Sequence, residues 1–167
     1  MTTSEPRWLS EEEQCTWRAY VAATQLVSDA LDRQLQRDAG MPHAYYHLLV
    51  MLSEVPGRRM RMTDLAERLK ITRSRLSHAI SRLERDGWVH REDCPDDRRG
   101  QLAVLSDGGY RALAEAAPGH AEQVRATVFD RLTPEQVRSL GEICGVIAEG
   151  LLQPPDGRTA ADLPWRR

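Results

Sequence analysis

Hydrophobic positions recur with helical spacing over the first forty residues. Ser10 is followed three residues later by Glu13, a pair that caps a helix at its N-terminus. The apolar residues after this cap form one helical stripe, which consists of Trp17, Val21, Leu26, Ala30, Leu31 and Leu35. Gly40 and Pro42 end the pattern. We therefore expect one long first helix between residues 10 and 40.

The middle of the chain alternates short apolar runs with turn signals. A second helix is expected over residues 42–55, and the Pro56-Gly57 turn ends it. The pattern then predicts a short strand (59–62), a helix capped by Thr63 (64–69), a helix that begins at Thr72 or Ser74 and ends at Asp86, and two strands (88–94 and 101–105) joined by a polar turn (95–100). Two helices followed by a hairpin predict a mainly α protein with a winged helix-turn-helix and a small β-hairpin wing.

Helical patterns also fill the rest of the chain. Ser106 begins a helix, which Pro118-Gly119 is expected to kink or interrupt before it resumes as far as Leu132. Thr133 and Gln136 form a second capping box. The helix that follows carries an apolar stripe of Val137, Leu140, Ile143, Ile147 and Leu151. Residues 1–9 and 153–167 are predicted to be flexible arms.

Composition narrows the class of protein. Of 167 residues, 41% are hydrophobic and 29% charged, which is typical of a globular chain. No apolar run is long enough to span a membrane. Three scattered cysteines, Cys15, Cys94 and Cys144, form no zinc or disulfide pattern, so a cytoplasmic location is expected. A secreted mini-protein, a membrane protein, a large two-domain enzyme and a zinc finger are excluded. No catalytic, cofactor-binding or metal-binding motif is present, so no enzyme activity is predicted.

Charge is unevenly distributed along the chain. The net charge is −2, but residues 58–99 contain 12 basic and 8 acidic side chains, and the remainder carries −6. A basic middle with acidic flanks indicates a local anion-binding surface.

Two features within this basic region point to nucleic acid. On a helical wheel of residues 72–86, Leu76, Ala79, Ile80 and Leu83 share one face, which leaves hydroxyls, His78 and arginines to face outward. Such side chains can read a major groove, although an ordinary solvated helix face has a similar composition. Arg98 and Arg99 are expected at the hairpin tip, where arginine can enter a narrow minor groove, although a polar turn is the simpler interpretation. The two features together are more specific than either one.

The sequence resembles the MarR family of bacterial transcriptional regulators. The resemblance covers residues 11–151 and is carried by DLAERL (64–69), RLERDGWV (82–89), DRRG (97–100) and LSDGG (105–109). It implies an obligate homodimer in which each subunit presents a recognition helix to the major groove and a wing to the minor groove. Many members release DNA when they bind a small lipophilic effector, and others sense oxidants.

By position, the resemblance assigns DNA contact to Thr72, Arg73, Ser74, Arg75, Ser77, His78, Arg82, Asp97, Arg98 and Arg99. Arg82 is expected to grip phosphate, and Asp97 is expected to brace Arg99. The domain is predicted to span residues 10–152, with dimerisation helices at 10–40 and 106–152 around a winged helix-turn-helix at 42–105. The expected partners are a second copy of the chain, double-stranded DNA with a pseudo-palindromic operator, and a small aromatic effector. The expected function is that of a repressor that the effector releases from DNA.

Several alternatives stay open. Trp17, Tyr45 and Tyr46 are candidates for an aromatic effector pocket, or they pack in the core or the dimer interface. Cys15 is a candidate redox sensor, although the neighbouring glutamates discourage a thiolate. His43 and His47 have metal-ligand spacing but are only two ligands. A redox- or metal-responsive regulator of the same fold, or a winged helix that binds only protein, is the alternative function.

Overall fold

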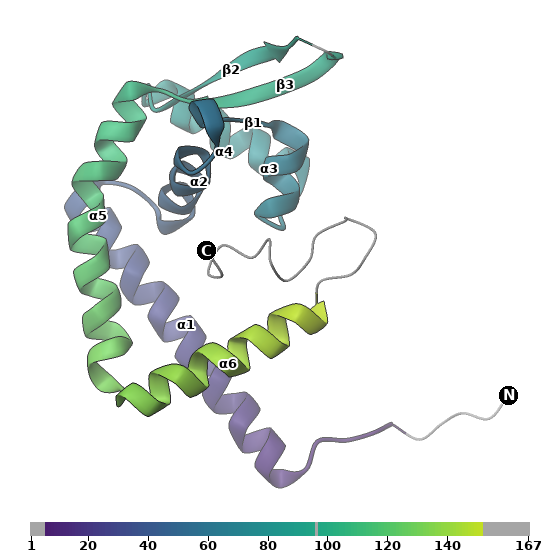
Figure 1. Cartoon of the computed structure of the whole chain (residues 1–167), viewed down its shortest axis with the longest axis vertical. Coiled ribbons are helices and arrows are strands. Elements are labelled where there is room, and N and C mark those ends of the chain that lie inside the picture. Colours follow the sequence, from purple (N-terminus) through teal and green to yellow (C-terminus); the bar gives the residue numbers. More distant parts are fainter. Residues whose placement is uncertain (1–5, 96, 152–167) are drawn as a thin grey trace, which may run out of the picture. The chain divides into compact units, whose positions relative to one another are not determined.

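The computed structural model describes residues 6–95 and 97–151 (Figure 1). The side chains of Arg98 and Arg99 lie outside this description, as does most of both predicted flexible arms. The chain forms two compact units, which comprise residues 1–124 and 125–167 and are described separately.

The first unit begins with a long helix, α1 (Glu11–Ala39). The predicted capping box is confirmed, because the Ser10 hydroxyl accepts a hydrogen bond from the Glu13 amide and the Glu13 carboxylate accepts one from the Ser10 amide. Gly40 adopts a left-handed conformation (φ 60°) and ends the helix. The next helix, α2 (His43–Ser53), begins directly after Pro42.

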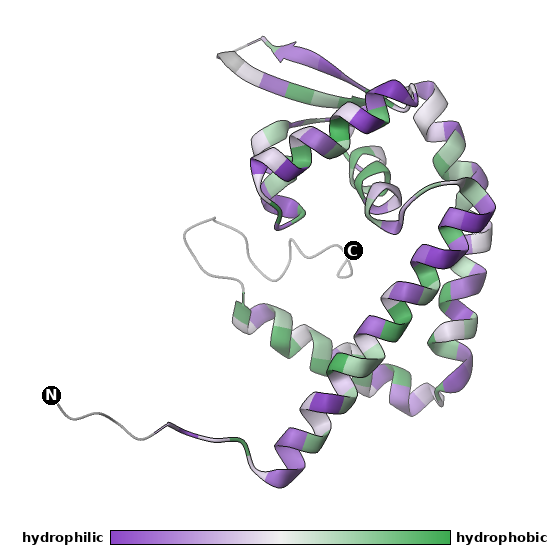
Figure 2. Ribbon diagram, turned by 180° about the vertical axis from the view of Figure 1, so that it is seen from behind, coloured by the Kyte–Doolittle hydropathy of each residue, from purple (hydrophilic) through white to green (hydrophobic). Residues whose placement is uncertain are grey.

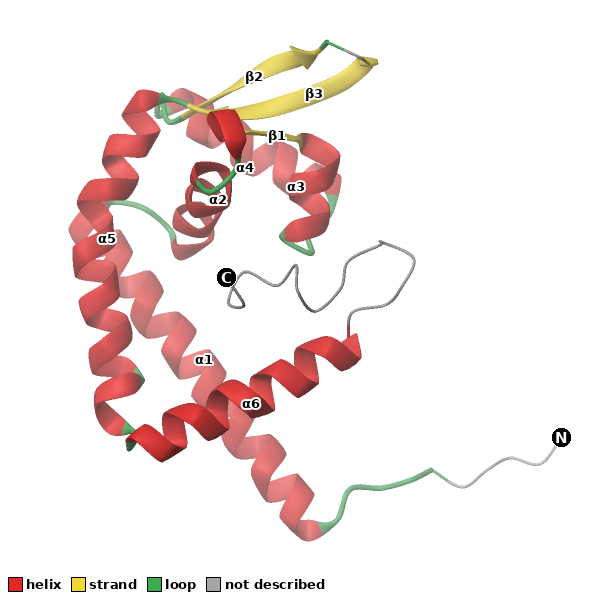
Figure 3. Cartoon of the chain, viewed as in Figure 1, coloured by secondary structure: helices red, strands yellow, loops and turns green. Residues whose placement is uncertain are grey.

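A winged helix-turn-helix follows, as predicted (Figure 3). A short 3-10 turn, η1 (Pro56–Arg58), leads into β1 (Arg59–Arg61), α3 (Met62–Arg68) and α4 (Arg73–Arg85). The wing consists of β2 (Val89–Cys94) and β3 (Asp97–Leu105). The three strands form one antiparallel sheet in the order β1-β3-β2, so β3 is central. The predicted fold class is confirmed.

The hydrophobic core lies between α2, α3, α4 and the sheet. Its largest fully buried side chains are leucine, isoleucine and methionine: Leu35, Met41, Leu48, Leu49, Leu52, Leu65, Leu76, Ile80 and Leu83. Helix α5 (Asp107–Thr127) joins this core through Leu113 and Ala116. The Ser106 hydroxyl caps α5 by accepting from the Gly109 amide at 2.9 Å. Gly109 is required there, because a Cβ at this position would lie 2.2 Å from the Trp88 carbonyl oxygen.

The structure differs from the prediction in α3, in α5 and in the turn of the wing. Helix α3 begins at Met62 rather than after Thr63, because the Thr63 hydroxyl bonds the Asp64 carboxylate instead of capping the helix. Helix α5 runs unbroken through Pro118 and ends at Thr127. Proline removes only one helical hydrogen bond, to the carbonyl of Ala114, and that residue is exposed to water. The predicted turn at 95–100 is shorter, since β3 already begins at Asp97.

The second unit contains a 3-10 turn, η2 (Phe129–Arg131), and the last described helix, α6 (Pro134–Leu151). The predicted capping box is confirmed by reciprocal hydrogen bonds between Thr133 and Gln136. No residue of α6 is buried, although the helix contains many apolar residues (green segments in Figure 2). Helix α1 is similar, since every residue from Glu11 to Leu26 is exposed. Both helices thus carry apolar side chains that the described chain does not cover.

Within residues 6–95 and 97–151, no helix has the length and apolarity needed to cross a lipid bilayer.

Candidate nucleic-acid interface

Helix α4 presents one face to the core and the other to solvent. Thr72 precedes the helix and caps it, because its hydroxyl accepts a hydrogen bond from the Arg75 amide at 3.2 Å. Leu76, Ile80 and Leu83 are buried and fix the rotation of the helix about its axis. The exposed side chains of the helix are Arg73, Ser74, Arg75, Ser77, His78, Ser81, Arg82 and Arg85. The structure therefore places the predicted contact residues of α4 on one accessible surface.

The arginines of α4 form no ion pairs within the described part of the chain. Among the described residues, no carboxylate forms an ion pair with the guanidinium of Arg73, Arg75, Arg82 or Arg85. By contrast, acidic residues of the wing and of the last turn of α4 are paired: Glu84 with Arg91, Glu92 with Arg59, and Asp97 with Arg61. The outward face of α4 is thus free to bind an anionic partner.

The wing contains a bulge next to its tip. The β2–β3 register shifts from Asp93↔Gln101 to Cys94↔Asp97, so residues 98–100 of β3 face no partner on β2. Bulges of this kind redirect the backbone and its side chains. Gly100 permits the tight approach, because a Cβ there would lie 2.9 Å from Asp97 Oδ2 and 3.1 Å from the Cys94 Cβ. The predicted arginines therefore lie in a bulge of β3 rather than in the connecting turn.

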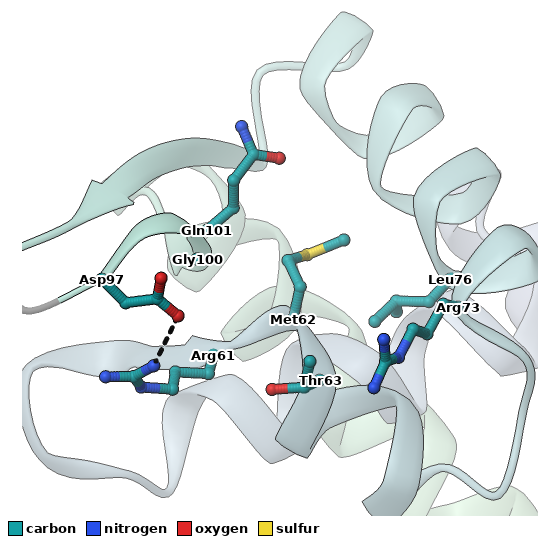
Figure 4. A pocket seen from close by; sticks show the side chains of 8 residues that line it. All are labelled: Arg61, Met62, Thr63, Arg73, Leu76, Asp97, Gly100 and Gln101. Atoms are coloured by element: carbon teal, nitrogen blue, oxygen red, sulfur yellow. Dashed lines mark hydrogen bonds and ion pairs between the residues drawn. The ribbon is translucent and has the colours of Figure 1, made fainter.

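A groove separates the wing from the start of α4 (Figure 4). Arg61 and Asp97 face each other on its wing side, with Arg61 Nη1 3.4 Å from Asp97 Oδ2. Arg73 and Leu76 line its α4 side. The bracing of Arg99 by Asp97 stays a prediction, because the Arg99 side chain lies outside the described part of the chain.

Comparison with known proteins identifies the family. Residues 39–100 match a family model described as "MarR family". Sco3205 from Streptomyces coelicolor, a MarR family transcriptional regulator solved in complex with DNA, is 63% identical to this chain. The match covers 97% of this chain and 100% of Sco3205, with a TM-score of 0.85.

This chain belongs to the MarR family of transcriptional regulators.

Two further relatives of this MarR protein support the assignment. AbsC, also a MarR family regulator from Streptomyces coelicolor, is 42% identical over 87% of this chain and 98% of AbsC, with a TM-score of 0.82. The repressor YetL from Bacillus subtilis is 26% identical over 107 residues. That match spans 62% of this chain and 64% of YetL.

The residues predicted for an effector pocket lie in different surroundings in this MarR protein. Tyr46 is buried, and its ring lies 4.3 Å from the ring of His120. Tyr45 borders a shallow groove together with Arg82, Arg85 and Trp88. Trp17 is 56% exposed and pairs with Tyr20 on α1. Asp32 accepts a hydrogen bond from the His43 amide and so marks where α1 meets the start of α2. Trp17 lies about 22 Å from Asp32 along α1. One protomer therefore does not bring Trp17 to the two tyrosines.

The structure also shows the surroundings of the cysteines and histidines that were candidates for redox or metal sensing. Cys15 and Cys144 are exposed free thiols, and Cys94 is buried at the wing. His43 packs against His120, with ring centroids 5.5 Å apart, whereas His47 is exposed. Burial lowers the pKa of both His43 and His120. In the described part of the chain, no three His, Cys, Asp or Glu side chains gather as metal ligands do.

Sequence reasoning missed two residues at this interface. Arg61 pairs with Asp97 on the wing side of the groove, and Arg91 of β2 contacts α4 at several points. The sequence offers one indication of the role of Arg91, namely Glu84, an acidic residue seven positions earlier near the end of the preceding helix. A helix-to-strand contact has no fixed sequence spacing, so this pair was not recognisable as one.

Proposed function

We propose that this MarR-family regulator is a homodimeric repressor that binds double-stranded DNA sequence-specifically. The observation that carries the proposal is the outward face of α4, where four arginine side chains lack acidic partners among the described residues. An α-helix of this width fits the major groove of B-form DNA, and arginine pairs bidentately with guanine. The 63% identity to Sco3205, which was solved with DNA, supports the same partner.

The contacts divide into two kinds. The first turns of α4, with Arg75, Ser77 and His78, are proposed to face base edges. Arg82 lies about 10 Å further along α4 than Arg75, where a helix leaves the groove and approaches phosphate. The bulged segment of β3 with Arg98 and Arg99 is proposed to follow the adjacent minor groove.

A second copy of the chain is proposed to cover the exposed apolar faces. Trp17, Leu26, Ile143 and Val146 are each more than half exposed, which leaves more apolar surface than a monomer usually presents. A two-fold dimer would bury these faces and place two recognition helices about one turn of DNA apart. The operator is accordingly proposed to be a pseudo-palindrome, and the protein to act in the cytoplasm.

Release by a small aromatic effector completes the proposal. Tyr45 and Tyr46 are the candidate contacts, and Trp17 can join them only where the dimer completes the pocket. An effector that lowers operator affinity must itself bind less tightly when operator is present, by the same factor.

Selection of duplexes from a random pool by the full-length protein tests the DNA-binding proposal. We expect enrichment of one pseudo-palindromic sequence, and at least a thousandfold preference for it over a scrambled duplex at physiological salt, about the lower end of typical specificity ratios. Repeating the selection with salicylate-like acids tests the effector. Equal binding to selected and scrambled duplexes would contradict sequence-specific recognition.

A further inference from the structure

The side chain of Arg91 links the wing to the recognition helix. Arg91 lies in β2, and its Nη1 donates to the Glu84 carboxylate near the end of α4. The same carboxylate accepts the Arg91 backbone amide at 3.1 Å. Nη2 donates to the Ser77 carbonyl oxygen and to Ser81 Oγ, both at 3.0 Å, and lies 3.4 Å from Ser77 Oγ. One guanidinium thus contacts three residues of α4.

These contacts constrain the helix over two turns. Ser77, Ser81 and Glu84 lie at positions i, i+4 and i+7, so they share one face of α4 and span about 10 Å of its axis. The Arg91 and Glu84 side chains are only 21% and 29% exposed. A partly desolvated, charge-assisted pair holds its geometry better than a surface ion pair does. Arg91 therefore ties this face of α4 to β2, in addition to the packing of Leu76, Ile80 and Leu83 on the core.

The contacts with Arg91 also determine whether the hydroxyl groups of Ser77 and Ser81 donate or accept hydrogen bonds. A guanidinium has donors only, so Ser77 and Ser81 must use an oxygen lone pair to accept from Arg91. Each hydroxyl then retains its own hydrogen as a donor. Phosphate oxygens and the N7 and O6 atoms of guanine are acceptors, so hydroxyls in this state suit DNA.

We propose that Arg91 is a positioning residue for DNA recognition. It sets the angle between the recognition helix and the wing and directs the Ser77 and Ser81 hydroxyls to donate, while Glu84 neutralises its charge. This inference rests on the proposed function. It assigns to Arg91 a role distinct from that of Arg75 or Arg82, which are proposed to touch DNA directly.

The test compares Arg91→Gln with Arg82→Gln on the selected operator and a scrambled duplex over a series of salt concentrations. For Arg91→Gln we expect at least a tenfold loss of preference for the operator, with the salt dependence of wild type. For Arg82→Gln we expect equal weakening on both duplexes and a salt slope reduced by about 0.9, because one phosphate contact is lost. Arg91→Lys retains the charge but not the fork of donors, so it should resemble Arg91→Gln.

A double variant keeps the test informative if Arg91→Gln fails to fold, as judged by circular dichroism. Ser77→Ala with Ser81→Ala removes both hydroxyls and should cost a similar factor in operator preference. In a folded Arg91→Gln background, Ser77→Ala should cost less than in wild type, because the two residues act together.

The outcomes are distinguishable. A salt slope that falls by about 0.9 in Arg91→Gln would overturn the inference, because Arg91 would then be a phosphate contact itself. Unchanged operator preference in folded Arg91→Gln, or in the double serine variant, would overturn it as well. If wild type shows no preference for any duplex, the proposed function fails first, and that result is visible before any variant is made.

Discussion

The imidazole of His120 packs against the phenol ring of Tyr46, with ring centroids 4.3 Å apart. This contact joins α5 to α2, and His43 adds a second ring 5.5 Å from that of His120. Nδ1 of His120 is buried and has no hydrogen-bond partner among the described residues. Asp32 accepts a hydrogen bond from the His43 amide, and His47 follows one turn later. The neutral form of the two half-buried imidazoles fits this cluster better than the charged form.

Protein stability should therefore fall on acidification. Burial lowers the pKa of His43 and His120 below the ordinary 6.5, with like-charge repulsion from neighbouring histidines as a smaller cause. The unfolded chain then binds more protons than the folded one as pH falls through 6.5, so the free energy of unfolding decreases. It should decrease less steeply in His120→Gln. Urea denaturation at a series of pH values measures this slope. As a control, His78→Gln at an exposed position on α4 should keep the wild-type dependence of unfolding free energy on pH. A wild-type pH dependence in His120→Gln would contradict a role for the cluster.

Gly109 should tolerate no side chain. A Cβ there would lie 2.2 Å from the backbone oxygen of Trp88, which cannot move away as a flexible side chain could. We expect Gly109→Ala to destabilise the protein by about 1–3 kcal/mol or more. Gly108→Ala is the matched control, since its nearest neighbour would be at 3.4 Å. Denaturant midpoints of the two variants measure the difference, and equal midpoints would contradict the packing described for α5.

Arg75 and Arg82 should contribute to DNA binding in different ways. Arg75→Ala should relax sequence preference at a cost of about 1–3 kcal/mol per contacted base. Arg82→Ala should weaken binding to all sequences and make the salt dependence shallower. Fluorescence anisotropy with the operator and a scrambled duplex separates the two effects. Wild-type affinity and salt slope in a folded Arg82→Ala protein would count against a phosphate contact.

The wing should contribute through A·T-rich flanks. Arg99→Ala should lose most affinity on operators whose flanking minor groove is narrow, because the electrostatic potential there is most negative. Asp97→Ala should show a milder loss, since it leaves the arginine in place. The measurement is affinity for operators that differ only in their flanks. Equal losses on A·T-rich and G·C-rich flanks would exclude minor-groove contact by Arg99.

The exposed apolar stripe of α6 should be required for dimerisation. Wild-type protein should scatter light with twice the monomer mass of 18.9 kDa at low micromolar concentration. Ile143→Asp should shift the mass toward the monomer, because it places a charge on an apolar interface. Arg138→Asp puts the same carboxylate on the opposite face of α6 and should remain dimeric. A wild-type monomer, or dissociation by Arg138→Asp alone, would contradict this interface.

Local signals in the sequence were sufficient for most of the fold. Capping boxes at Ser10 and Thr133 and the glycine at 40 act within a few residues of the helix ends that they define. The helical spacing of Leu76, Ile80 and Leu83 likewise predicted the face of α4 that packs on the core. These features depend on neighbours in the chain, so the sequence contains them directly.

Features that depend on distant residues were less predictable. Pro118 was expected to kink or interrupt α5, but the helix continues through it, and Leu113 and Ala116 of the preceding turns pack on the core. The contact between Tyr46 and His120 joins residues 74 positions apart. Arg91 likewise looked like an ordinary strand residue until β2 was placed beside α4. The sequence could name the residues of the candidate interface on α4 but not those that hold α4 in position.

The strand order also divides the wing into two mechanically different parts. Residues 102–104 of β3 lie between partner residues of β1 and β2, whereas Gln101 and Asp97 have register partners on β2 only. A two-stranded ribbon is only marginally stable by itself, so amide protons at the outer end should exchange with solvent faster than those at the base. When the wing contacts a DNA groove, part of the enthalpy gained would then be offset by the entropy lost on ordering the outer end of the β2–β3 hairpin. The temperature dependence of binding, rather than affinity alone, would carry the signature of this hairpin.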